Sequence, residues 1–218
     1  MTKVLSGKDL ATSIRQEVTL SAERLRADGI VPKLVIVVAT RDPSTLSYVR
    51  SIVTSAEKTG SATQVMELSE TSSAGDIIAA LDAAGVDSTV HGVLLQTPLP
   101  ANVDLAEVSL HIPVAKDIDG ASPLSLGRLA MGLSSYAPAT AEAVMELLSF
   151  HQVPLAGRSV AVVGRSTVVG KPLALLLLAA DATVTVCHSK TVDLAQVTRR
   201  CEVVVAAVGQ AELIGAGH

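Results

Sequence analysis

A glycine-containing turn in the second half of the chain has the composition of a phosphate-binding site. The turn, GRSTVVGKP, lies between an apolar run and a helical pattern. Backbone N–H groups at the start of a helix bind phosphate, and glycines let the phosphate approach closely. The spacing differs from G-x-G-x-x-G, so an ordinary strand–helix turn is the alternative. Because further strands follow, we interpret the turn as a nucleotide site formed by Gly164, Arg165, Ser166, Val169, Gly170 and Pro172.

The polar residues after the next apolar run indicate which nucleotide is bound. An NAD site usually carries an Asp or Glu about 20 residues after the glycine turn. Here that region reads CHSKT and contains no acid. Hydroxyl groups, Lys190 and the nearby Arg165 suit a ribose 2′-phosphate, which favours NADP; a solvated polar loop is the alternative. The further residues that we predict to bind the cofactor are His188, Ser189, Thr191 and Gly209.

Polar residues also follow apolar runs in the first half of the chain. Tyr48 lies in the helical pattern after one run, and Gln96 ends another run, directly ahead of Thr-Pro-Leu-Pro. In an open parallel sheet, ligands bind outside the carboxyl ends of the strands. Tyr48 and Gln96 are therefore candidate site residues, and the segment KDIDG at 116–120 is another.

Strand-length apolar runs alternate with helical patterns around these motifs. In the first half, the sequence predicts strands at 33–39, 62–68 and 91–96 and helices at 9–28, 45–59 and 74–84. Gly29, Gly60 and Gly85 stand where helix C-caps are expected. Strands that are apolar throughout, separated by helices, indicate a parallel sheet that is covered on both faces.

A second alternating unit follows a turn-rich stretch at 98–123. It has expected strands at 159–164, 182–188 and 202–209 and expected helices at 140–151 and 171–180. This order is half of a doubly wound nucleotide fold. The predicted class is α/β with two lobes: an N-terminal parallel α/β domain, residues 1–139, and a Rossmann-like nucleotide-binding domain, residues 140–218.

The composition excludes several classes of protein. Hydrophobic residues make up 49% of the 218 residues and the net charge is −4, which excludes a disordered chain and argues against a nucleic-acid partner. The apolar run 173–180 is too short to span a membrane. Cys187 and Cys201 form neither a disulfide framework nor a metal cluster, so we expect buried thiols, no metal and a cytoplasmic location.

Taken together, the motifs resemble those of the methylenetetrahydrofolate dehydrogenase/cyclohydrolase family. The matching pieces, in family order across nearly the whole chain, are DPSTLSYV, GVLLQTPLP, KDIDG, P-x-x-x-G-R-L, VVGRSTVVGKP, TVTVCHSKT and VVVAAVG. The resemblance implies oxidation of 5,10-methylenetetrahydrofolate by NADP, followed by hydrolysis of the methenyl product to 10-formyltetrahydrofolate. It also implies a homodimer.

The resemblance also assigns roles to individual residues. Asp119 matches an Asp that binds the pterin ring, and Tyr48 matches a Tyr that lines the folate site. Gln96 matches a Gln that supports a catalytic Lys four residues after the Tyr. The catalytic set expected here is Tyr48, Gln96 and Asp119, and Pro98 and Leu99 join these three in the substrate-binding set.

The chain departs from the family where the lysine is expected. Ile52 occupies that position, and Thr54 replaces a second family lysine. Arg50 points off the Tyr48–Ile52 face of the helix, and Lys58 lies about 240° round it from Ile52. Because an isoleucine cannot carry a proton, we favour a dehydrogenase with weak or no cyclohydrolase activity.

Three other readings remain open. The chain is fully bifunctional through another proton relay, or it is a catalytically silent folate- or nucleotide-binding paralogue, or it is a different NADP-dependent dehydrogenase acting on an amino or keto acid. The last reading needs a cationic substrate clamp, for which Arg41 is the candidate. The resemblance further leads us to expect that the second lobe is cut short at its C-terminus.

Overall fold

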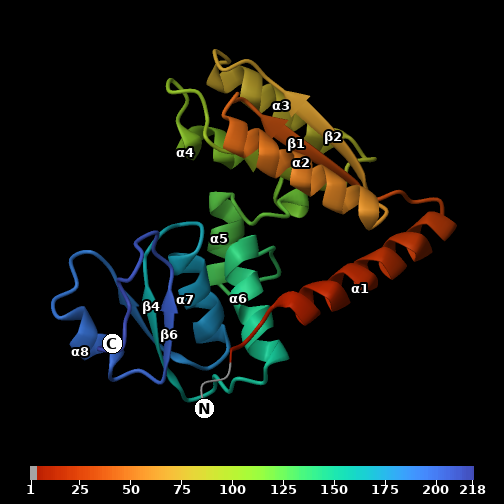
Figure 1. The fold of residues 1–218 in the computed structure, drawn as a ribbon. Helices are drawn as coiled ribbons and strands as arrows, with labels where there is room; N and C mark the ends of the chain where they lie inside the picture. Colours follow the sequence, from red (N-terminus) through yellow and green to blue (C-terminus); the bar gives the residue numbers. More distant parts are fainter. Residues whose placement is uncertain (1–3) are drawn as a thin grey trace. The chain divides into compact units, whose positions relative to one another are not determined.

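The computed structural model describes residues 4–218, which form two compact units. One unit is Ser6–Ser125, and the other is Leu126–His218 together with Val4 and Leu5 (Figure 1). The division falls inside a helix, whereas the sequence places its domain boundary at 139/140.

The first unit is a three-stranded parallel sheet with helices. Its elements are α1 (Lys8–Ala27), β1 (Lys33–Val38), α2 (Pro43–Lys58), β2 (Ala62–Glu67), α3 (Ala74–Val86), β3 (Gly92–Gln96), α4 (Leu105–Val108) and two 3-10 turns, Ser109–His111 and Val114–Lys116. The strand order is β2-β1-β3, so β1 is central. Its last residue, Val38, pairs with Glu67 on one side and with Gln96 on the other.

Alternation along β1 explains why helices cover both faces of this sheet. Val35 and Val37 pack with Ile77 and Leu81 of α3. Ile36 and the other inward residues of the opposite face pack against α2. Figure 1 shows α2 and α3 on opposite sides of the strands. Each such side chain contributes about 1.5–3 kcal/mol when fully buried. The pairing of the strands and the helix on each face confirm the predicted parallel sheet that is covered on both sides.

The second unit repeats this plan with shorter strands. Its elements are α5 (Pro123–Ala130, which begins before the division), α6 (Ala139–Phe150), β4 (Ser159–Val163), α7 (Gly170–Ala179), β5 (Thr183–Cys187), α8 (Leu194–Thr198) and β6 (Val203–Ala206). The parallel order is β5-β4-β6. Val160 and Val162 of β4 pack with Leu173 and Leu177 of α7 and with Ala141 of α6, which makes an aliphatic core (Figure 1).

Three local features differ from expectation or add to it. Gly29 and Gly60 follow α1 and α2 with positive φ angles, as predicted, but Gly85 lies inside α3. The prediction for Gly85 is wrong because the Lys116 ammonium group binds the last carbonyl groups of α3, which removes the need for a left-handed C-cap. Helices α5 and α8 were not predicted.

The structure also bears on the membrane and cysteine expectations. Over residues 4–218, none of the helices combines the length and the apolar character that crossing a bilayer requires. Cys187 is buried, and desolvation raises the pKa of its thiol, which keeps the unreactive protonated form. In the same part of the chain, His, Cys, Asp and Glu side chains do not gather in threes as metal ligands would.

Candidate functional site

Helix α2 carries Tyr48, and the Asp42 side chain fixes where that helix begins. Asp42 is the N-cap, and its carboxylate accepts hydrogen bonds from the Thr45 N–H and the Thr45 hydroxyl, both at 2.8 Å, and from the Ser44 hydroxyl. Pro43 occupies the first helical position, where its missing N–H costs nothing. Tyr48 stands in the second turn with 56% of its surface exposed.

We expect Asp42→Ala to lower the thermal unfolding midpoint by a few degrees, because the first turn loses its cap. Hydrogen bonds from Ser44 and Thr45 lower the pKa of Asp42 below its ordinary value of 3.8. The stability that this carboxylate contributes is therefore complete above about pH 3.8 and is lost as the pH falls through the lowered pKa. Asp42→Asn is the control, since Asn also caps helices but does not titrate there. A midpoint unchanged by Asp42→Ala would contradict the assigned cap.

Alternation along β3 places Gln96 on the α2 side of the sheet. Leu94 packs in the cluster that lies under α2, and residues two apart on a strand face the same way. Gln96 and Gly92 therefore share that face. The Gln96 amide nitrogen donates to the Thr97 carbonyl oxygen at 3.2 Å. Beyond it the Thr97–Pro98 peptide is cis, Pro98 is exposed, and Leu99 packs against the core on the α3 side.

The KDIDG segment reaches the same face through Ile118. Asp117 forms a parallel bridge with Val93, which places the segment along the free edge of β3. Ile118 then lies over Gly92, where an added Cβ atom would stand 2.9 Å from its Cγ2 atom. The structure thus brings Tyr48, Gln96 and the turn that carries Asp119 to the α2 side of one sheet.

Ile52 stands on the same side, beside a cavity. The cavity has a volume of about 500 Å³, and its lining combines apolar side chains such as Leu34, Ile52 and Ile118 with the basic residues Arg15, Lys33 and His91. Ile52 is half-buried and packs with Ile36, Val38 and Val49. A lysine at this position would stand between apolar side chains and beside a cavity lined by Arg15 and Lys33, and both desolvation and nearby like charge lower a lysine pKa.

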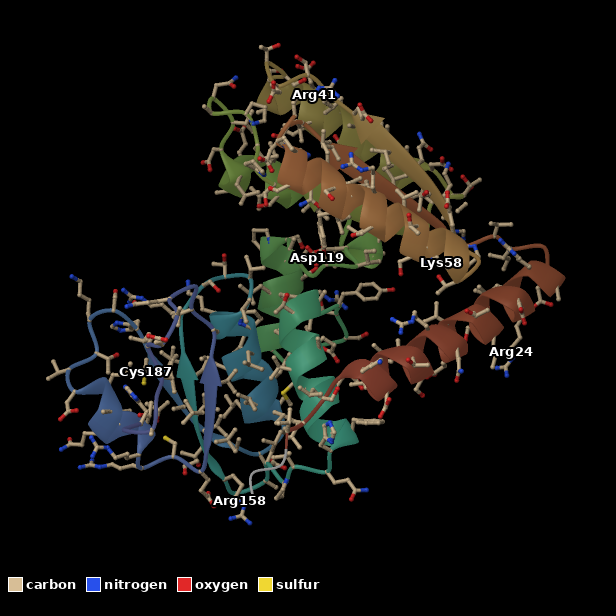
Figure 2. All side chains as sticks on the ribbon, in the orientation of Figure 1. Arg24, Arg41, Lys58, Asp119, Arg158 and Cys187 are labelled. Atoms are coloured by element: carbon tan, nitrogen blue, oxygen red, sulfur yellow. The ribbon has the colours of Figure 1, made fainter. Side chains whose placement is uncertain are left out.

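The other cations considered for the first unit lie elsewhere. Arg50 and Lys58 are exposed, and Figure 2 shows Lys58 at the end of α2 opposite to Arg41. Arg41 pairs with Glu67 at 2.9 Å, and its backbone N–H donates to Glu70. Because the Arg41 guanidinium is already paired with Glu67 and a second carboxylate lies at its backbone, the site is unfavourable for an anionic amino or keto acid.

Close backbone packing defines the glycine turn of the second unit. Gly164 has φ of +129°, and a Cβ atom there would lie 2.2 Å from the carbonyl oxygen of Ala207. A Cβ atom on Gly170 would lie 2.1 Å from the carbonyl oxygen of Gly164. The two glycines therefore hold the end of β4, the start of α7 and the chain after β6 in contact. Pro172 is buried in the first turn of α7.

Hydroxyl groups stabilise both polar turns of this unit. The Ser166 hydroxyl accepts from the Val169 and Gly170 N–H groups at 3.1 and 3.3 Å. The Thr191 hydroxyl accepts from the His188 N–H at 2.8 Å, and the His188 ring accepts from the Lys190 N–H. The structure thus gives Ser166 and Thr191 a role in shaping the turns, which the sequence did not reveal.

The exposed donors around these turns fit a phosphorylated nucleotide. Arg165, Ser189 and Lys190 are exposed, and Gly209 has no atom within 4 Å of a Cβ placed on it. Residues 188–192 after β5 carry a lysine and hydroxyl groups and no acid, which suits a ribose 2′-phosphate, and the next residue, Asp193, caps α8. These residues are the ones that would hold NADP.

A parallel sheet with polar side chains at its strand ends, followed in the chain by a second parallel sheet with a glycine turn between strand and helix, is typical of two-domain nucleotide-dependent dehydrogenases. Family models agree with this class. Residues 5–119 match the catalytic domain of tetrahydrofolate dehydrogenase/cyclohydrolase, and residues 138–218 match its NAD(P)-binding domain. The chain belongs to the tetrahydrofolate dehydrogenase/cyclohydrolase family.

Individual relatives support this membership. The chain is 50% identical to the bifunctional protein FolD of a Parafrankia species, over 99% of this chain and 78% of the relative. It is 52% identical to FolD 1 of Saccharopolyspora erythraea, over 100% of this chain and 74% of the relative. The family and the α/β fold class predicted from the sequence are therefore confirmed.

Solved structures of the family have the same fold. The bifunctional enzyme FolD of Campylobacter jejuni gives a TM-score of 0.96 at 33% identity, over 99% of this chain and 77% of that one. The Trypanosoma brucei enzyme, solved with NADP cofactor and inhibitor, gives 0.89 at 32% identity, over 96% and 72% of the two chains.

Proposed function

We propose that this chain oxidises 5,10-methylenetetrahydrofolate to the methenyl compound with NADP and that it does not accelerate the hydrolysis of that product. The oxidation follows from membership of the family and from the nucleotide turn. The missing hydrolysis rests on one observation: Ile52 occupies the lysine position and packs into the apolar cluster under α2.

The residues of the first unit supply binding and orientation. According to the resemblance, Asp119 binds the pterin ring, and Tyr48, Gln96 and Pro98 line the folate site. Leu99 belongs to the same expected set, although its side chain packs against the core on the α3 side. NADP, when bound, supplies the hydride acceptor. Hydride transfer depends on holding the folate and nicotinamide rings in the right position and orientation more than on a protein base. It therefore does not need the lysine. The hydrolytic step needs a group that moves protons, and Ile52 has none.

Four further points belong to the same proposal. Residues 1–139 bind folate and residues 140–218 bind NADP. The NADP contacts come from Arg165, Ser189 and the backbone of the glycine turn. Residues 188–192, which directly follow β5, contain no acid, and this supports NADP over NAD. The protein acts as a cytoplasmic homodimer: the assembly is what the family resemblance implies, and the location is the one expected from the cysteine content.

The proposal is tested with two substrates. Purified protein with methylenetetrahydrofolate and NADP should form the methenyl compound, and NAD should support a much lower kcat/KM. When the protein is mixed with methenyltetrahydrofolate and no NADP, this substrate should hydrolyse at the spontaneous rate that is measured in the absence of protein. Accelerated hydrolysis would show that another proton relay exists. Absence of oxidation, with or without NADP binding, would refute the dehydrogenase and leave a silent paralogue.

A further inference from the structure

Asp119 stands in a tight turn formed by residues 117–120. The Gly120 N–H donates to the Asp117 carbonyl oxygen at 3.0 Å, and Gly120 has φ of +56°. Asp119 is therefore the third residue of the turn, and its side chain is half-buried. A turn of this kind holds the side chain of its third residue in place only if the chain segments on both sides of the turn, its two stems, are themselves fixed.

Lys116 fixes the first stem to helix α3. Its ammonium group donates to the carbonyl oxygens of Ala84, Gly85 and Asp87 at 3.1, 2.7 and 2.7 Å. An ammonium group has three donors, so all of them are used on the end of one helix. The carbonyl groups there lack helical partners and carry the negative end of the helix dipole, which makes the attachment favourable.

Asp117 fixes the turn to the segment that follows it. Its carboxylate is 1% exposed and accepts from the Ala121 N–H at 3.0 Å, the Ser122 N–H at 2.9 Å and the Ser125 hydroxyl. A buried carboxylate is tolerated only where hydrogen bonds replace its water. The Asp117 carboxylate therefore binds groups of the protein itself and does not serve as a ligand-binding group.

Ile118 completes the attachment by packing over Gly92 at the start of β3. Three consecutive residues before Asp119 thus contact three different elements by three kinds of interaction: charged hydrogen bonds, a buried carboxylate and apolar contact. Of the four residues KDID, only Asp119 contacts the substrate in our proposed function.

We propose that Lys116 and Asp117 are positioning residues that hold the Asp119 carboxylate in the place where it binds the substrate. The proposal rests on the role of Asp119 in the proposed function. Misplacement of a binding group by about 1 Å can cost about 100-fold in rate, so loosening either stem should lower turnover although neither residue touches the substrate.

The experiment compares Lys116→Met and Asp117→Asn with Asp119→Asn. Lys116→Met keeps the chain length of the side chain and removes its donors, and Asp117→Asn keeps the shape and removes one acceptor. Each should lower kcat/KM for methylenetetrahydrofolate about 10- to 100-fold and leave the Kd for NADP within about twofold. Lys33→Met is the matched control, because Lys33 also pairs with Asp87 at the end of α3, at 3.9 Å, but does not hold the turn.

A double variant separates positioning from general stability. If Lys116 acts through Asp119, Lys116→Met should have no further effect on kcat/KM when Asp119 is already replaced by Asn. As a single variant with Asp119 intact, Lys116→Arg keeps the positive charge and N–H donors and should be more active than Lys116→Met. Additive losses, or a loss of stability with normal folate kinetics, would overturn the proposal. A wild type without oxidation would instead refute the proposed function. Normal folate kinetics in Asp119→Asn would remove the role of Asp119 and with it the need to position it.

Discussion

Replacing Gly170 with alanine is expected to weaken NADP binding by about 100-fold or more. The new Cβ atom would lie 2.1 Å from the Gly164 carbonyl oxygen and 2.6 Å from its carbon. Both are backbone atoms, so no side chain can rotate away, and the turn between β4 and α7 must open. In the proposed site the opened turn gives up backbone hydrogen bonds to the phosphate, and two such bonds correspond to about 100-fold weaker binding or more. Overpacking of this kind also lowers the free energy of unfolding by about 3 kcal/mol.

The measurements are calorimetric titration with NADP and urea unfolding. Gly127→Ala is the control, because Gly127 lies inside α5 and a Cβ atom on it meets nothing within 4 Å. It should bind NADP normally and gain about 0.5–1 kcal/mol of stability, since alanine is the better helix former. If Gly170→Ala bound NADP as tightly as the unaltered chain, the glycine turn would not be the phosphate site.

Replacing Ile52 with lysine is expected to create cyclohydrolase activity. The new side chain would stand one helical turn from Tyr48, on the side of the sheet that Gln96 faces. General acid–base catalysis is worth at least about 100-fold, so hydrolysis of methenyltetrahydrofolate should exceed the spontaneous rate by about that factor. Replacing a half-buried isoleucine by a lysine should cost about 1–2 kcal/mol of stability.

Val53→Lys is the matched control for this variant. Val53 is half-buried in the same cluster as Ile52, so its replacement should cost similar stability. It points about 100° away round the helix and should leave hydrolysis at the spontaneous rate. If Ile52→Lys still oxidised the folate without any gain in hydrolysis, the missing lysine would not be the reason for the missing step.

Apolar runs made much of the fold predictable. The strands at 33–38 and 159–163 are buried nearly throughout, so their sequences carry no helical period and few polar residues. Helix ends were less predictable. Gly85 stands where a C-cap glycine is expected, but α3 continues past it because Lys116, which is distant in sequence, binds the last carbonyl groups of the helix. Helix α5 was missed although Pro123 at its start is a helix signal.

The candidate site could be predicted as a list of residues but not as an arrangement. Asp117 and Asp119 are both acids of one short motif, and only burial shows that the first serves the turn. Ser166 and Thr191 are similar in that their hydroxyl groups accept backbone hydrogen bonds within their own turns. Such roles depend on which N–H groups the folded backbone brings near, and residue type does not specify that.

Both sheets place their earliest strand in the middle, and this has a consequence for synthesis. β1 pairs with β2 and β3, and β4 pairs with β5 and β6. During translation, each central strand emerges before either of its neighbours exists. One of its edges stays unpaired until the next strand has left the ribosome, and the other edge until the strand after that has done so. In each unit the strand that is most buried in the folded protein is thus made first, so the nascent chain is most prone to aggregate while the segments after β1 and β4 are being made.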